Sequence, residues 1–351
     1  MNCCSECFSN PYLKGIINSE TSLGDCNYCD STNVNIHNPK DLNLIFQNIL
    51  DLYVVNVEEG KPIENHIQLD FPDQIFSSKV SGSVKPLLQE IVSDDFDTYE
   101  QLFNHNVVNV TKHSESTAVS EPFLITWEKF ANEIKTINRF HIENVLDLEK
   151  LQTLLSYYEK SITRGKRFYR ARISSLEGHP IEKMRNPPKE LARPGRANPE
   201  GISYLYLSDN ELTTLYEVRA SLYDYVTIGE FRLLEDIKVV DLRGNNFDPI
   251  YLAENTEGGL KDILAYQPFT TELEKQLSKP KRRNDHELDY LPTQYLSEFI
   301  KSIGFDGVQF QSSLYDEGYN LAIFDADLFE CISTKVCEVK KIDISHETLG
   351  R

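Results

Sequence analysis

A window of basic residues lies near the middle of an otherwise acidic chain. Between Arg164 and Asn198 there are ten Lys or Arg and three Asp or Glu, a local charge of +7 in a protein of formal net charge −19. Cationic residues concentrated against the charge of the whole surface indicate a site for a small polyanion such as a dinucleotide. A nucleic acid is not expected as the ligand, because the surrounding acidic surface would repel it.

Four side chains in and after this window have the chemistry that such a ligand needs. Arg170 and Arg196 each carry a planar guanidinium that can donate paired hydrogen bonds to a diphosphate. Tyr206 offers a phenol, and Glu217 offers a carboxylate that can stabilise a cation. The alternatives are surface ion pairing for the arginines, core packing for Tyr206 and a solvent-facing helix position for Glu217.

The local sequence predicts the elements that position these side chains. The segments FYRAR and ISYLYLS, which contain Arg170 and Tyr206, are strands by their β-branched and aromatic content. Between them, the glycines and prolines of ARPGRANPEG predict an ordered turn around Arg196. Ser208 with Glu211 three residues later predicts a capping box, which starts the helix that carries Glu217.

In order and spacing these segments, together with GFDGVQFQSS and GYNLAIF, resemble the RES domain, named for an Arg, a Glu and a Ser. The resemblance covers roughly Lys166 to Phe329. It implies a fold similar to that of ADP-ribosyltransferases and an activity that cuts the nicotinamide-ribose bond of NAD. RES domains are found as toxins of bacterial toxin-antitoxin pairs, and a partner protein that covers the active site often holds them inactive.

The resemblance also implies roles for individual residues. Ser312 fits the serine of the family, with the adjacent Ser313 as an alternative, and Asn320 is a supporting residue. Arg193 and Tyr204 are weaker candidates. The expected catalytic residues are Glu217, Tyr206, Arg196 and Ser312, and the expected NAD-binding residues are Arg170, Arg196, Tyr206, Ser312 and Asn320.

The leading hypothesis is therefore an NAD-degrading enzyme, either a glycohydrolase or a phosphorylase, that acts as a bacterial toxin or defence effector. Its expected partners are NAD and an antitoxin or inhibitory protein. Two alternatives stay open at this point. The first is a protein ADP-ribosyltransferase, which shares the first half-reaction. The second is a non-catalytic zinc-ribbon adaptor, which the joint presence of the site residues disfavours.

The cysteines predict a metal site at the N-terminal end of the sequence. Cys4-x2-Cys7 and Cys26-x2-Cys29 are separated by eighteen residues, a spacing typical of one tetrahedral zinc. Four thiolates would close the coordination sphere, so the metal would be structural. Reduced unliganded thiols and a redox pair are the alternatives, and the adjacent Cys3 competes with Cys4 as the ligand.

The region before the basic window is predicted to be mainly helical. Apolar residues repeat at helical spacing from Asn38 to Val55, from Phe123 to Phe140 and from Val145 to Tyr158. The region resembles the N-terminal domain, sometimes described with HEPN proteins, that accompanies RES domains. It contains no convincing copy of the Arg and His pair that HEPN ribonucleases use.

After Glu217 the runs VTIGEFRLL, IKVVDL, GVQFQSS and NLAIF predict strands, with a possible bulge at Gly229, and a helix is expected from Pro292 to Gly304. The segments SESTAVSEP and KPKRRNDHELD read as loops. The fold class is α/β (α+β), a mixed-sheet RES domain preceded by a zinc knuckle and a helical region. The expected division is residues 1–36 zinc knuckle, 37–160 helical domain, 161–335 catalytic domain and 336–351 tail.

The sequence also bears on location. No stretch approaches the eighteen apolar residues that span a bilayer, and MNCCSECFSN lacks the regions of a signal peptide. The clustered cysteines differ from the even spread of a secreted disulfide framework. A cytoplasmic protein with no membrane partner is expected.

Overall fold

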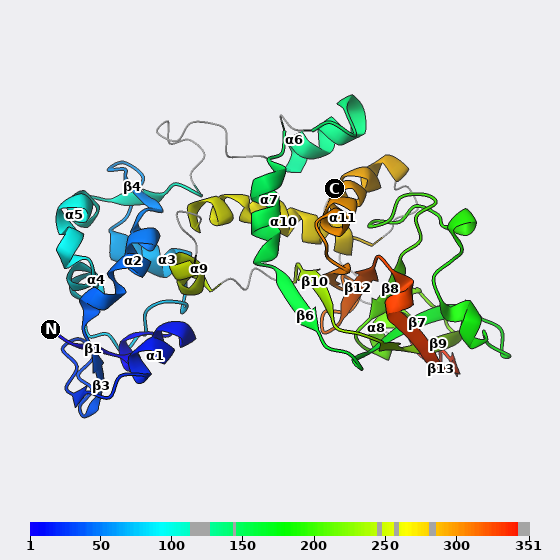
Figure 1. The fold of residues 1–351 in the computed structure, drawn as a ribbon, viewed down its shortest axis with the longest axis horizontal. Helices are drawn as coiled ribbons and strands as arrows, with labels where there is room; N and C mark the ends of the chain where they lie inside the picture. The colour runs from blue at the N-terminus through cyan, green and yellow to red at the C-terminus, as the bar shows by residue number, and fades with distance from the viewer. Residues whose placement is uncertain (113–126, 143–144, 244–247, 256–259, 281–285, 343–351) are drawn as a thin grey trace. The chain divides into compact units, whose positions relative to one another are not determined.

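The computed structural model describes residues 1–112, 127–142, 145–243, 248–255, 260–280 and 286–342. The chain divides into two compact units, residues 1–124 with 246–267 and residues 125–245 with 268–351 (Figure 1). The loop predicted at 114–122 lies outside the described residues, and so do residues 281–285 of the loop predicted at 279–289. The end of that second segment is not a loop, because Glu287–Tyr290 form a 3₁₀ helix. Among the described helices, none combines the length and apolar character that a membrane span requires.

The second unit is built on an eight-stranded mixed sheet with the order β13-β9-β7-β8-β12-β11-β10-β6. Of its neighbouring strand pairs only β10 and β11 run parallel. This sheet confirms the predicted fold class. The strands are β6 (Glu159–Ile162), β7 (Arg167–Ser174), β8 (Leu205–Ser208), β9 (Tyr225–Leu233), β10 (Ile237–Asp241), β11 (Gly307–Gln311), β12 (Tyr319–Ile323) and β13 (Phe329–Glu338).

Apolar side chains from seven of these strands pack into one core, as the alternation of the sequence requires. Phe168 of β7, Phe231 of β9 and Phe329 of β13 are almost fully buried in it. The prediction of a bulge at Gly229 is wrong, because Gly229 keeps regular register with both neighbouring strands. The register shifts instead in β13, between Cys331 and Ser333. The predicted tail boundary at Val336 also falls inside β13, which ends at Glu338.

Among the helices of the second unit, α8 (Glu211–Glu217) lies against strands of the sheet (Figure 1). The others include α6 (Trp127–Asn132), continued by a π-helical turn at Glu133–Ile137, α7 (Leu148–Ser156) and α11 (Leu291–Ser302). The long helix α10 (Leu260–Ser278) contains the unit boundary and ends in the second unit. α11 begins with a proline in its first turn and ends before Gly304, whose φ of 97° suits the residue after a helix.

The first unit is mainly helical, as the sequence predicted. Its helices are α1 (Pro11–Asn18), α2 (Asn43–Leu50), α3 (Ile63–Asp70), α4 (Lys85–Ile91), α5 (Phe96–Asn104) and α9 (Pro249–Asn255). Its short strands are β1 (Cys3–Cys4), β2 (Leu23–Gly24) and β3 (Val34–His37), which form one sheet, and β4 (Tyr53–Val55) and β5 (Val107–Asn109), which form an antiparallel pair.

The single helix predicted from Asn38 to Val55 is corrected. A 3₁₀ helix at Pro39–Leu42 leads into α2, which ends at Leu50, and Tyr53–Val55 form β4. The periodicity of the apolar residues is right as far as Leu50. Beyond it the β-branched and aromatic residues pair with β5, a partner that lies about fifty residues away in sequence.

Candidate functional site

A cavity of about 410 Å³ opens in the second unit, where several sheet connections converge. Its walls come from β7, the turn after Pro194, β8, α8, the C-terminal end of α10 and the β11–β12 pair. Polar and charged side chains dominate one part of the lining: Arg170, Arg196, Tyr206, Ser208, Glu217, Arg219, Lys279 and Asn320. The structure therefore brings together the residues that the sequence selected for NAD binding, with Ser312 just behind them.

Glu217 is the only carboxylate that lines this cavity among the described residues. It is the last residue of α8, and its Oε1 accepts two hydrogen bonds, from Ser312 Oγ at 2.7 Å and from Asn320 Nδ2 at 2.7 Å. The other oxygen, Oε2, has no protein partner in the described part of the chain. One oxygen thus fixes the carboxylate, and the other remains available to a ligand.

The two donors to Glu217 are themselves held in place. Ser312 follows the end of β11, and its Oγ accepts from the backbone N–H groups of Leu314 and Tyr315, both at 3.3 Å, so its own hydrogen points to Glu217. Asn320 lies in β12 opposite Ser208 of β8, and the hydroxyl of Ser208 donates to Asn320 Oδ1 at 2.7 Å. That bond orients the amide, so its nitrogen faces the carboxylate.

A close approach of backbone brings α8 against the β11–β12 connection. A Cβ at Gly318 would lie 1.9 Å from Oγ1 of Thr213, which is fully buried in α8. Only glycine fits at this point. The carbonyl oxygen of Gly318 also accepts from the N–H of Ser312, so the same contact that seats α8 positions the serine.

The start of α8 differs from the sequence prediction. Asn210, in an extended conformation, is the N-cap, and its side chain accepts from the N–H of Thr213 at 2.9 Å. The capping box predicted from Ser208 and Glu211 is wrong. Ser208 is the last residue of β8, and pairing with Asn320 keeps it in the sheet.

Arg170 presents a buried positive charge to the cavity. Its Nη1 is buried and has no hydrogen-bond partner in the described structure. Burial, followed by repulsion from Arg172, lowers the pKa of the Arg170 guanidinium to about 10. Buried polar atoms normally have partners, so an unpartnered cationic nitrogen in a cavity wall indicates a site for an anion.

Arg196 also lines the cavity, but much of its guanidinium is already engaged. Nη1 donates to the carbonyl oxygen of Gln276 at 3.3 Å, and Nη2 donates to that of Pro280 at 3.2 Å. The guanidinium carbon lies 4.9 Å from the centre of the Tyr290 ring. Arg196 therefore stabilises the carbonyl end of α10 while it contributes positive charge to the cavity.

Tyr206 reaches the cavity from β8, and its hydroxyl is used to hold the neighbouring turn. The hydroxyl donates to Asn198 Oδ1 at 2.8 Å and accepts from the N–H of Ala197 at 3.4 Å. Burial raises the pKa of Tyr206 to about 12. The phenol is thus neutral near pH 7, and its ring rather than its hydroxyl is the part offered to a ligand.

The weaker candidates lie elsewhere. Tyr204 and Arg193 do not line the cavity, and the hydroxyl of Tyr204 donates to Glu298 of α11. Ser313, the alternative to Ser312, donates to the carbonyl oxygen of Ser278. Sequence reasoning missed Arg219 and Lys279 as lining residues. Arg219 had one usable signal, its position two residues after Glu217, at the φ of 50° that follows the helix end.

The four predicted zinc ligands cluster in the first unit. The Sγ atoms of Cys4, Cys7, Cys26 and Cys29 all lie within 4.8 Å of one another, and the Cys4–Cys29 and Cys7–Cys26 pairs are each 3.4 Å apart. None of these cysteines forms a disulfide. Four thiol groups at these separations fit the donor set and closed coordination of a structural zinc site.

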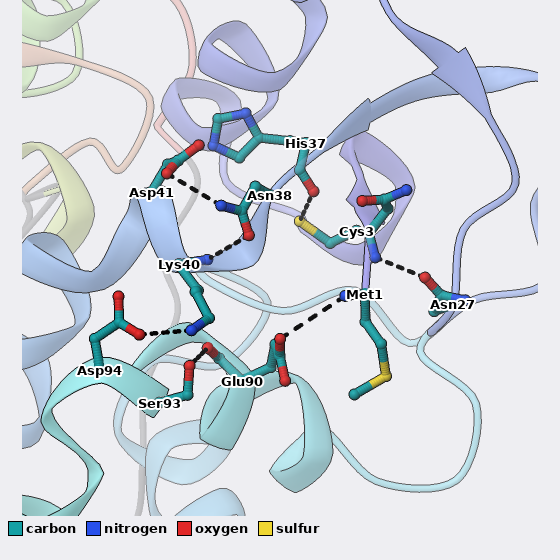
Figure 2. Close-up of polar contacts among 11 residues, drawn as sticks. Met1, Cys3, Asn27, His37, Asn38, Lys40, Asp41, Glu90, Ser93 and Asp94 are labelled. Atoms are coloured by element: carbon teal, nitrogen blue, oxygen red, sulfur yellow. Dashed lines mark hydrogen bonds and ion pairs between the residues drawn. The ribbon is translucent and has the colours of Figure 1, made fainter.

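Cys3 lies outside this cluster, although it is fully buried. Its Sγ donates to the carbonyl oxygen of His37 at 3.5 Å, across the pairing of β1 with β3 (Figure 2). Successive residues of a strand point to opposite faces, so Cys3 and Cys4 cannot both face the other thiols. The geometry therefore favours Cys4 as the ligand.

Comparison with known protein families gives a match that lies mostly in the second unit. The model of the RES domain matches residues 167–343, half of the chain. The chain belongs to the RES domain family. The match begins at the first residue of β7 and includes every residue of the Glu217 network. The expectation drawn from sequence resemblance is confirmed at the level of the family.

Among solved structures, the RES chain is similar to one in the crystal structure of the M. tuberculosis MbcT-MbcA toxin-antitoxin complex. The two chains are 14% identical, and the comparison covers 55% of this chain and 94% of that one, with a TM-score of 0.33. The fold assignment rests on the strand order and on the family model. No curated protein matches the chain.

Proposed function

We propose that this RES protein is an enzyme that cleaves the nicotinamide-ribose bond of NAD, with Glu217 as the catalytic carboxylate. The observation that carries the proposal is the fixed Glu217 in one cavity with the unpartnered guanidinium nitrogen of Arg170. One group is suited to a developing cation and the other to a diphosphate. In NAD one ribose carries both the bond to nicotinamide, where the cation develops, and the diphosphate.

The role of Glu217 follows from where charge develops. As the bond to nicotinamide breaks, positive charge grows on the ribose carbon, and a carboxylate already in place stabilises it without reorganisation. Ser312 and Asn320 hold Oε1, so Oε2 is the oxygen that faces the ribose. These two residues are positioning residues in the proposal, which differs from a direct catalytic role for Ser312.

The cationic lining supplies substrate binding. Arg170, Arg196, Arg219 and Lys279 outnumber the single carboxylate of the wall, and a diphosphate would offset this excess of positive charge. Arg170 makes the strongest contribution, because its Nη1 has no hydrogen-bond partner among the described residues. The ring of Tyr206 offers a face for the nicotinamide or its ribose.

The proposal extends to the rest of the chain. The cysteine cluster would bind one structural zinc, which would stabilise the first unit and take no part in the chemistry. Inhibition by an antitoxin that covers the cavity, and action as a toxin or defence effector in the cytoplasm, remain predictions from the family resemblance.

The test is product analysis with purified full-length protein and NAD. Release of nicotinamide with ADP-ribose identifies water as the acceptor, and ADP-ribose-1″-phosphate in phosphate buffer identifies a phosphorylase. Transfer of labelled ADP-ribose to a protein identifies an ADP-ribosyltransferase. Absence of NAD cleavage in all three assays would contradict the proposal and favour the adaptor alternative.

A further inference from the structure

The turn that carries Arg196 is held in place by several hydrogen bonds. We use the term arginine loop for residues Gly195–Asn198. The N–H of Gly195 donates to the carbonyl oxygen of Asn198 at 2.9 Å and closes the loop. A Cβ at Gly195 would lie 2.5 Å from Asn198 Oδ1 and 3.0 Å from the Tyr206 hydroxyl, so the loop has no room to shift toward β8.

The opposite side of the arginine loop is held by α11. Gln294 is 5% exposed, and its Nε2 donates to the carbonyl oxygen of Gly195 at 2.8 Å and to that of Asn198 at 3.1 Å. The two N–H groups of the Gln294 side-chain amide thus bind the carbonyl oxygens at both ends of the arginine loop. The neighbouring Thr293, 1% exposed, has its Oγ1 2.5 Å from the carbonyl oxygen of Arg196.

We propose that Gln294 is a positioning residue for substrate binding, which acts by fixing the backbone of the arginine loop so that Arg196 meets the diphosphate in one orientation. This inference rests on the proposed function, since it takes NAD to be the ligand that Arg196 binds. Gln294 does not line the cavity. Nothing in the local sequence of α11 distinguishes it from a core position.

Arg196 depends on this support because its side chain contacts one part of the structure while its backbone is bound to another. Its guanidinium donates to the carbonyl end of α10 and lies over the Tyr290 ring, while its backbone is tied to α11. A rotation of the backbone would break these side-chain contacts together. Small displacements of a binding group are costly, because hydrogen bonds to a diphosphate are directional.

The experiment compares Gln294→Leu and Gln294→Glu with wild type. Leu removes the Nε2 donors from both carbonyl oxygens, and Glu keeps the shape but presents acceptors to acceptors. We expect the KM for NAD and the Kd for ADP-ribose, measured by calorimetry, to rise by on the order of tenfold in both variants. The kcat should change much less, because Glu217 and its donors are untouched.

A double-mutant cycle separates positioning from general damage. If Gln294 acts through Arg196, Gln294→Leu should raise KM no further in an Arg196→Ala background. The matched control is Ser297→Ala, one turn along α11, which removes a buried hydroxyl bonded to the carbonyl oxygen of Thr293 within the same helix. It should leave KM unchanged even if it lowers the melting temperature.

The possible failures are distinguishable. An unchanged KM in folded Gln294 variants, or a full additional effect in the Arg196→Ala background, would overturn the inference while the proposed function stands. If one variant fails to fold, the other provides the test. A wild-type protein that neither cleaves NAD nor binds ADP-ribose would contradict the proposed function, and the inference would fail with it.

Discussion

The hydroxyl of Ser312 donates to Oε1 of Glu217 over 2.7 Å, although the two residues are 95 positions apart in sequence. The bond links the end of β11 to the end of α8. It also leaves the serine hydrogen committed to a carboxylate, and therefore not available to a substrate phosphate.

Glu217→Gln should abolish NAD cleavage and preserve binding. The amide oxygen of Gln can still accept from Ser312 and Asn320, so the local structure is retained while the negative charge is lost. We expect kcat to fall by about a hundredfold or more, with little change in the Kd for ADP-ribose. Steady-state kinetics and calorimetry measure the two quantities. Near-normal turnover in a variant with normal circular dichroism would remove Glu217 from the mechanism.

Ser312→Ala and Ser313→Ala should differ. Loss of the Ser312 hydroxyl removes one of two donors that orient Glu217, so kcat should fall by about tenfold with a smaller effect on KM. Ser313 is exposed, and its hydroxyl donates to the carbonyl oxygen of Ser278 and not to Glu217, so its variant is the control and should keep wild-type kcat. Equal effects from the two changes would contradict the assignment of Ser312.

Arg170→Met should separate stability from binding. Replacing a guanidinium whose buried Nη1 has no partner among the described residues by an apolar chain of similar length should stabilise the free protein by about 1 kcal/mol. The same change should eliminate measurable ADP-ribose binding. Thermal melts with and without ADP-ribose report both effects, since the ligand should raise the melting temperature of wild type alone. A variant that is less stable and binds normally would show that Arg170 is structural.

Zinc should be present at about one ion per chain. Metal analysis after purification without chelator measures it, and a strong chelator should lower the melting temperature of the first unit. Cys26→Ser should lose the metal. Cys3→Ser is the matched control and should retain it, because Cys3 Sγ faces the His37 carbonyl. Absence of metal, with rapid reaction of all thiols in the folded protein, would exclude the site.

The environment of Asp241 predicts that the second unit loses stability in acid. Burial alone would raise the pKa of its carboxyl, but the hydrogen bonds and charge of Arg243, with Lys160 beyond, lower it below the ordinary value. Because the pKa is lower in the folded state than in the unfolded state, the stabilisation is present above the unfolded value, about 3.9, and is lost as pH falls through the folded value. Urea unfolding between about pH 3 and 6 measures this.

Asp241→Asn should be less stable than wild type near neutral pH and lose less stability on acidification. Asp316→Asn, at an exposed position, is the control and should follow the wild-type curve. If the Asp241 variant and wild type lose stability in parallel over this range, the ion pair does not account for the acid limb.

Sequence reasoning located the strands that carry Arg170 and Tyr206 and the helix that carries Glu217, because their signals are local in composition and spacing. It failed where two local signals competed. Ser208 and Asn210 are both good N-cap residues, and the choice was made by pairing of β8 with β12, which holds Ser208 in the sheet. The helix predicted to Val55 was shortened in the same way, by pairing of β4 with β5.

The parts of the site that could not be predicted depend on distant contacts. Arg196 has its guanidinium on carbonyls about eighty residues along the chain, and its backbone on α11 about a hundred residues away. Single-sequence patterns carry no information on such pairs. The choice of Cys4 over Cys3 needed only the alternation of a two-residue strand, but the strand itself was not recognised.

The dispersion of the Glu217 network along the chain has a consequence during synthesis. Glu217 leaves the ribosome long before Ser312 and Asn320, and until both have been translated the carboxylate lacks its donors and the sheet lacks β11 and β12. An unfinished or truncated chain that ends before residue 312 contains the arginines and the glutamate but no assembled centre. The centre is therefore completed late in translation, and nascent chains that end before residue 312 would lack the activity proposed for it.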